Sequence, residues 1–144
     1  RSSVEVMCEL HQDYVVQPFI GSSSGRDIRI IVVGGQAVAA MQRTAQVGEY
    51  RANFHRGGQG QLISISDQLR DLAIRATAAI GLEVAGVDLL ETNGTLEDTA
   101  YAVLEVNPSP GLEEIEAVTQ IGIAEAIIEH GEQVAGEVRS LPLS

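Results

Sequence analysis

The sequence predicts one α+β domain over residues 1–144, with a mostly antiparallel sheet and helices packed on one face. Gly34-Gly35 joins two apolar runs, which is typical of a hairpin because a type I′ turn needs positive φ at both central residues. Apolar residues recur at helical spacing after Ser66. Later in the chain, two strand patterns each have one wholly apolar face, which needs a covering helix.

The expected elements follow in chain order. A short strand is expected over residues 14–20, and the two hairpin strands are expected over 27–33 and 36–43. Ser66 is a suitable N-cap for the first helix, and Gly81 is a suitable C′ residue. The remaining elements are strands over 84–91 and 101–107 around a turn over 92–98, a helical turn over 112–118 and a helix over 121–131.

Composition limits the function classes. The 144 residues carry a formal net charge of −11, and such an acidic surface repels nucleic-acid phosphates. No apolar run approaches the roughly 20 residues of a membrane-spanning helix. The single cysteine, Cys8, forms no intramolecular disulfide and fits a reducing, cytoplasmic location. All nine basic residues are arginines, so phosphate chemistry here would depend on arginines, metal ions or residues outside the chain.

Three polar strand residues are candidates for chemistry. Alternation along the strand over 101–107 places Glu105 and Asn107 on one face, together with Tyr101 and Val103. If the two later strands pair as a hairpin, Asp88 lies opposite Glu105 or one step away. Three oxygen donors on one face suit a hard cation such as Mg²⁺ shared with substrate phosphates. The two carboxylates could instead do acid–base work, or all three residues could form only the solvated face of the sheet.

The long polar loop over residues 44–61 is the second candidate. Loops of this length inside a compact domain are usually functional or mobile. Arg51, Asn53 and Arg56 lie in this loop, ahead of Gly57-Gly58. Guanidinium groups bind phosphate oxygens with two parallel hydrogen bonds, so the loop is a candidate phosphate-binding segment. The alternative is a surface loop without a ligand.

These segments resemble a known family. Gly86-Val87-Asp88 and the run over residues 104–112 resemble the metal-binding end of the ATP-grasp fold. The run over residues 50–58, together with Asp27-Ile28-Arg29, is similar to the RimK-like glutamate ligases of the ribosomal protein modification family. The resemblance covers residues 14–130 and preserves the family's order of motifs. It implies the C-terminal subdomain of an ATP-grasp domain.

The resemblance also implies roles for single residues. Asp88, Glu105 and Asn107 match ligands of two Mg²⁺ (or Mn²⁺) ions that bridge the ATP phosphates. In the implied reaction, Arg51 and Arg56 are expected to hold the phosphoryl and acylphosphate oxygens. The positions that match nucleotide contacts are Gln17, Pro18 and Phe19 of the adenine hinge, Asp27 before the central strand, and Arg51 and Asn53 of the loop.

Two positions depart from the family pattern. Pro18 stands where the family usually has glutamate, and proline offers no backbone N–H, so the adenine contact would rest on Phe19 or on carbonyl groups. Gly122 stands where the family usually has aspartate, which weakens the N-cap of the last helix.

The implied reaction joins glutamate to a carboxylate of a protein or small molecule through an acylphosphate, at the expense of ATP. The family carries nucleotide-binding lysines and an N-terminal α/β domain upstream of the hinge, whereas only 16 residues precede Gln17 here. The chain is therefore expected to be the C-terminal part of a larger ligase and inactive alone. The alternatives are a non-catalytic nucleotide- or metal-binding remnant and an ATP-grasp ligase of another amino acid or peptide. No nucleic-acid or membrane partner is expected, and homo-oligomerisation is left open.

Overall fold

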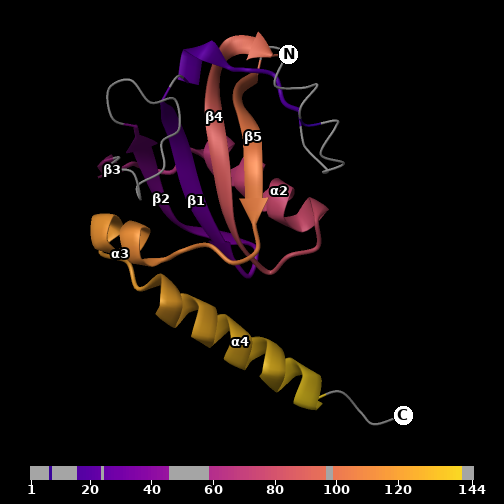
Figure 1. The fold of residues 1–144 in the computed structure, drawn as a ribbon. Coiled ribbons are helices and arrows are strands. Elements are labelled where there is room, and N and C mark those ends of the chain that lie inside the picture. Colours follow the sequence, from indigo (N-terminus) through magenta and orange to yellow (C-terminus); the bar gives the residue numbers. More distant parts are fainter. Residues whose placement is uncertain (1–6, 8–15, 24, 46–58, 97–98, 141–144) are drawn as a thin grey trace.

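The computed structural model describes residues 7, 16–23, 25–45, 59–96 and 99–140. Five antiparallel strands form one sheet in the order β3-β2-β1-β4-β5 (Figure 1). The strands are β1 (Arg26–Val33), β2 (Gln36–Thr44), β3 (Gln59–Leu62), β4 (Val84–Leu96) and β5 (Thr99–Asn107). The helices are α2 (Asp67–Ala79), α3 (Glu113–Thr119) and α4 (Ile123–Ser140), and a short 3₁₀ turn, η1, spans Gly21–Ser23.

The β1–β2 hairpin forms where the sequence predicts it. Gly34 and Gly35 have φ values of 56° and 74°, which confirms the expected turn with positive φ at both positions. The pairing register shifts between Ile31 and Val32, which face Ala39 and Ala37, so Val38 is the extra residue of a β-bulge. The bulge decides which β2 side chains share a face with β1.

The β4–β5 hairpin contains a second bulge. Asp88 lies directly opposite Glu105, as expected, but the next pair is Leu89 with Val103, so Leu104 is the extra residue. The expectation that Tyr101 and Val103 share a face with Glu105 is wrong, because an inserted residue reverses the alternation. Tyr101 packs instead against the apolar cluster beneath the opposite face.

Helices cover both faces of the sheet. Ile30 and Val32 of β1 pack with Leu69 and Ala73 of α2. The other face packs against α3 and the start of α4, and its buried cluster consists of Ile31, Val33, Ala39, Met41, Ile115 and Ile123. Figure 1 shows α2 and α3 on opposite sides of the sheet.

The prediction of helices on one face is therefore wrong. Successive side chains of a strand point to opposite faces, and residues 30–33 of β1 are all apolar and buried, so both faces need a cover. Only the first half of β1 carries charge on the α3 side, at Asp27 and Arg29. That face is thus divided into a charged end and an apolar end.

The first helix matches its predicted ends. Ser66 caps α2 by accepting a hydrogen bond from Leu69 N at 3.3 Å, and Gly81 follows the helix with a φ of 70°. The last helix lacks an aspartate at Gly122, but the Glu116 side chain accepts a hydrogen bond from Ala124 N at 2.8 Å. A side chain from α3 therefore satisfies a backbone donor in the first turn of α4.

Other boundaries differ from those expected. Residues 16–20 form no strand, and Gln59–Leu62 of the predicted loop forms β3, which pairs with β2. Strand β4 continues into the predicted turn as far as Leu96, and α4 continues to Ser140. None of the helices in the described part of the chain is long and apolar enough to span a membrane.

Candidate functional site

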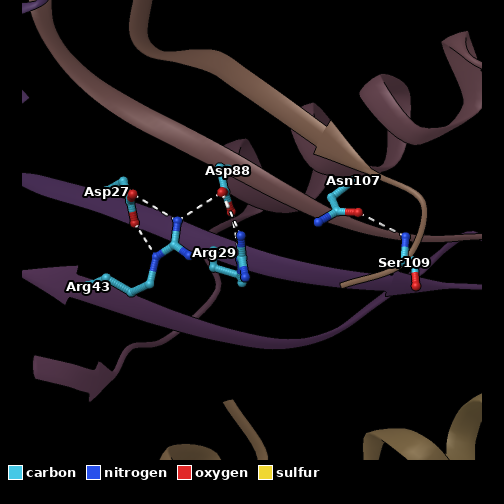
Figure 2. Close-up of polar contacts among 6 residues, drawn as sticks. All are labelled: Asp27, Arg29, Arg43, Asp88, Asn107 and Ser109. Carbon is cyan, nitrogen blue, oxygen red and sulfur yellow. Dashed lines mark hydrogen bonds and ion pairs between the residues drawn. The ribbon is translucent and has the colours of Figure 1, made fainter. Parts of the chain in front are cut away.

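Charged side chains from neighbouring strands meet on the α3 side of the sheet. Arg43 lies directly opposite Asp27 in the β1–β2 register, and Arg29 lies directly opposite Asp88 in the β1–β4 register. Arg43 donates to Asp27 Oδ1 and Oδ2 at 2.6 and 2.8 Å. Arg29 donates to Asp88 Oδ1 and Oδ2 at 2.8 and 2.7 Å (Figure 2). Both ion pairs are bidentate, which is the strongest geometry for an arginine–carboxylate pair.

One further hydrogen bond joins the two pairs. Arg43 Nη2 also donates to Asp88 Oδ2 at 2.8 Å, so Asp27, Arg43, Asp88 and Arg29 form one ion-pair network. The network contains two formal positive and two formal negative charges. Its side chains are 5% to 14% exposed. Charges at this depth persist only when they are paired and hydrogen-bonded.

Burial and pairing act in opposite directions on the network's protonation. Burial raises the pKa of Asp27, and the hydrogen bond and charge of Arg43 only partly offset this effect. Burial acts to lower the pKa of Arg43, but the hydrogen bond to Asp27 and the charges of Asp88 and Asp27 raise it overall. Arg43 therefore remains a fixed positive charge between two carboxylates.

Sequence reasoning missed the arginines of this network. Asp27 and Arg29 are two residues apart on a strand, a spacing that places opposite charges on one face and could have indicated a paired role. The position of Arg43 depends on the bulge at Val38, for which the sequence carries no comparable signal.

The structure brings two of the three predicted metal ligands into direct register. Glu105 is exposed and lies opposite the buried Asp88. Asn107 lies opposite Gly86, two positions along the same face, and its Oδ1 accepts a hydrogen bond from Ser109 N at 2.9 Å. The three side chains thus come from two adjacent strands at one end of the sheet face.

The segment after β5 folds back over β4. A Cβ atom on Gly86 would lie 2.7 Å from Pro110 Cβ, far closer than ordinary contact. Gly86 therefore leaves the space that Pro110 fills, and this contact holds the Asn107–Pro110 segment beside the predicted ligands.

The donor set suits a hard cation only with help from other ligands. Asp88 accepts three hydrogen bonds, one on Oδ1 and two on Oδ2. A carboxylate can accept about four, so one acceptor position on Oδ1 remains. The described residues contain no group of three or more histidine, cysteine, aspartate or glutamate side chains that could hold a metal. Two carboxylates and an amide fit Mg²⁺ or Mn²⁺ when water and phosphate oxygens complete the coordination.

The predicted adenine hinge lies beside the β5 bulge. Gln17 Nε2 donates to the Leu104 carbonyl at 3.3 Å, and Phe19 is 76% exposed. The hydroxyl groups of Ser22 and Ser23 both donate to the Glu91 carbonyl, at 2.9 and 2.5 Å, which ties the following turn to β4. Pro18 is also exposed. Gln17 of the predicted hinge therefore contacts the residue next to Glu105.

The predicted loop residues Arg51, Asn53 and Arg56 lie outside the described residues. Their contacts with phosphate and nucleotide remain predictions.

Comparison with known proteins decides the family. A family model described as the RimK-like ATP-grasp domain matches residues 1–130. The chain belongs to the RimK-like ATP-grasp family. It is 45% identical over 140 residues to a probable alpha-L-glutamate ligase 1 of Shewanella denitrificans, covering 97% of this chain and 46% of that protein. It is 46% identical over 141 residues to a probable alpha-L-glutamate ligase of Coxiella burnetii, covering 97% and 45%. The chain therefore spans less than half the length of these relatives.

Solved structures show the same fold. D-alanine–D-alanine ligase from Bacillus anthracis, complexed with ATP, matches 94% of this RimK-like chain and 49% of its own, with a TM-score of 0.58 and 15% identity. ATP-grasp ligase PsnB, complexed with minimal precursor, Mg and ADP, matches 74% and 33%, with a TM-score of 0.55 and 24% identity. At these identities the likeness concerns the ATP-grasp fold alone.

Proposed function

We propose that this chain is the C-terminal, metal-binding part of an ATP-dependent carboxylate–amine ligase that adds glutamate to a protein or small-molecule carboxylate. The observation that carries the proposal is the register of Asp88 with Glu105, on the face that also presents Asn107. The names of the relatives, probable alpha-L-glutamate ligases, support the choice of glutamate. The ATP, ADP and Mg in the similar ligase structures support the choice of nucleotide and ion.

The reaction has two balanced steps. An oxygen of the acceptor carboxylate attacks the γ-phosphorus of ATP, the bond to the bridging oxygen breaks, and ADP leaves. The glutamate amine then attacks the acyl carbon, phosphate leaves with the bonding pair, and the nitrogen loses a proton to give the amide. Two Mg²⁺ or Mn²⁺ ions would neutralise the charge that develops on the transferred phosphoryl group.

The proposed roles of the chain's own residues follow from their positions and from the family. Asp88, Glu105 and Asn107 hold the ions, and Arg51 and Arg56 hold the phosphoryl and acylphosphate oxygens. Direct nucleotide contacts are assigned to Gln17, Pro18, Phe19, Arg51 and Asn53, and Asp27 belongs to the same proposed nucleotide-binding set. Because Arg43 occupies both carboxylate oxygens of Asp27, we assign Asp27 an indirect contribution through Arg43. A cytoplasmic location accompanies this proposal.

The test measures ADP release and amide formation with ATP, glutamate and a panel of carboxylate acceptors. A full-length protein that includes this chain is expected to ligate, whereas the 144-residue chain alone is not. Glu105→Ala is expected to reduce ligation by more than about 100-fold, because it removes a proposed ligand of the cations that would stabilise the transferred phosphoryl group. Loss of one such stabilising contact costs about 2.7 kcal/mol or more. Glu129→Ala, an exposed carboxylate on α4, is the matched control and is expected to retain activity.

A non-catalytic module is the second candidate. The observation that favours it is that two arginines already occupy most of the Asp88 carboxylate. A folded full-length protein that binds nucleotide and Mn²⁺ but ligates no amino acid to any acceptor would establish this reading. Ligation of an amino acid other than glutamate would instead identify another branch of the ATP-grasp ligases.

A further inference from the structure

Arg29 and Arg43 differ in how many carboxylate partners they have. Arg43 has Asp27 as a partner of its own, in addition to its bond to Asp88. All hydrogen bonds and ion pairs that Arg29 makes with the described residues go to Asp88. The Arg29 side chain is also the more exposed, at 14% against 6% for Arg43. Arg29 is therefore the guanidinium that can leave Asp88 while the rest of the network stays paired.

Arg29 occupies the oxygens that a cation would need. Its Nε and Nη2 groups bond both carboxylate oxygens of Asp88, and Oδ2 is shared with Arg43. A cation that binds both oxygens must displace Arg29. A cation that binds only the remaining lone pair of Oδ1 must lie close to a positive guanidinium, in surroundings where solvent screens charge poorly.

The charge of the site points the same way. The four network residues carry a formal total of zero, so a divalent cation would bring two positive charges. Among the proposed ligands in the described part of the chain, the exposed Glu105 is the one carboxylate left to offset them. Phosphate groups arriving with the cation would supply the missing negative charge. Their oxygens could also accept a bidentate contact from the guanidinium of Arg29 once it is released from Asp88.

We propose that Arg29 makes divalent-cation binding at Asp88 dependent on bound phosphate. Without nucleotide, Arg29 holds the carboxylate and opposes the cation. With nucleotide, the cation takes Asp88 and Arg29 turns toward phosphate oxygens. The inference rests on the proposed function, since it takes Asp88 to be a cation ligand, and it assigns Arg29 a positioning role that governs the order in which cation and nucleotide bind.

The test measures Mn²⁺ binding directly, from the electron paramagnetic resonance signal of free Mn²⁺, in the full-length protein with and without a non-hydrolysable ATP analogue. In the parent protein the analogue is expected to tighten Mn²⁺ binding by at least about tenfold. Arg29→Gln, which leaves Asp88 paired with Arg43, is expected to tighten binding of Mn²⁺ alone by about tenfold. Arg29→Lys keeps the charge and is expected to bind Mn²⁺ alone as weakly as the parent.

Arg75→Gln is the matched control, because Arg75 makes an exposed ion pair with Asp71 on α2. It is expected to leave both Mn²⁺ affinities unchanged, and circular dichroism shows whether each variant is folded. Tight binding of Mn²⁺ alone to the parent protein overturns the inference, even if Arg29→Gln does not fold. Equal Mn²⁺ affinity of folded Arg29→Gln and the parent overturns it as well.

The two proposals fail in different ways. If calorimetry detects no binding of the analogue and ligation is absent, the proposed function fails. If the analogue binds and ligation proceeds, but Arg29→Gln does not change the binding of Mn²⁺ alone, only the role of Arg29 fails.

Discussion

Arg43 Nη2 lies 2.8 Å from Asp88 Oδ2, although β1 separates their strands in the sheet. The guanidinium crosses the intervening strand and contacts Asp27 of that strand on the way. One side chain thus links β2, β1 and β4 on the polar half of the sheet face. This link makes the predicted ligand Asp88 part of the fold's internal structure as well as of its candidate site.

Removal of Arg43 is expected to destabilise the fold strongly. Arg43→Ala leaves Asp27 buried without its guanidinium partner, and loss of one member of a buried pair costs about 3–5 kcal/mol. Urea denaturation followed by circular dichroism measures the change in the free energy of unfolding. The control is Arg70→Ala, whose ion pair with Asp67 is exposed, and no measurable change is expected there. Equal changes in the free energy of unfolding for the two variants would contradict the proposed contribution of the ion-pair network to stability.

The two opposed carboxylates are expected to respond differently to substitution. Asp88→Ala removes the shared acceptor of Arg29 and Arg43 and is expected to lower the free energy of unfolding by about 3 kcal/mol. Glu105→Ala removes an exposed carboxylate and is expected to change it by less than about 0.5 kcal/mol. Urea titrations of both variants check this difference. A large destabilisation by Glu105→Ala would mean that loss of ligation in that variant reports on folding rather than on chemistry.

Gly86 is expected to tolerate no side chain. In Gly86→Ala the new Cβ would lie 2.7 Å from Pro110 Cβ, so the segment that follows Asn107 must move, at a cost of about 1–3 kcal/mol. Pro110→Gly removes the opposing atoms, and the double variant is expected to recover part of the loss. Gly131→Ala on α4 is the control. Nothing lies within 4 Å of its Cβ position, and alanine is expected to stabilise this helix by up to about 1 kcal/mol.

The two glycines of the first hairpin give a matched pair. Both have positive φ, but a Cβ on Gly34 would lie 2.6 Å from Nδ1 of His130, whereas nothing lies within 4 Å of one on Gly35. Gly34→Ala is therefore expected to lower the melting temperature more than Gly35→Ala, by the equivalent of about 1 kcal/mol. In a His130→Ala background the difference is expected to disappear. If it persists, the contact between the hairpin and α4 is not its cause.

The hairpins could be predicted from local chemistry, but their registers could not. The Gly34-Gly35 turn is visible in the sequence, and counting residues outward from it pairs Asp27 with Gln42. The bulge at Val38 moves the pairing by one residue, so Arg43 faces Asp27 instead. Bulges depend on how the finished sheet packs and twists, so a residue count from the turn cannot locate them.

The candidate site shows the same limit. Alternation and a short turn predict that Asp88 lies opposite Glu105 or one step away, and in the structure the two residues are directly opposite. The side of the sheet taken by Tyr101 did not follow, because the bulge at Leu104 reverses the alternation beyond Glu105. The second helical layer was missed for a different reason. Four consecutive buried apolar residues of β1 indicate cover on both faces, whereas the apolar pattern by itself predicts only a strand.

The proposed double use of Asp88, as an ion-pair partner and as a cation ligand, has an evolutionary consequence. A substitution that loosens the guanidinium contacts would free this carboxylate for a cation and at the same time weaken the joint between three strands. Cation affinity and heat tolerance would then be selected in opposite directions at one residue. Lineages that adapt to higher temperature are expected to change residues around the ion-pair network, at positions that neither arginine contacts, before they change the network itself.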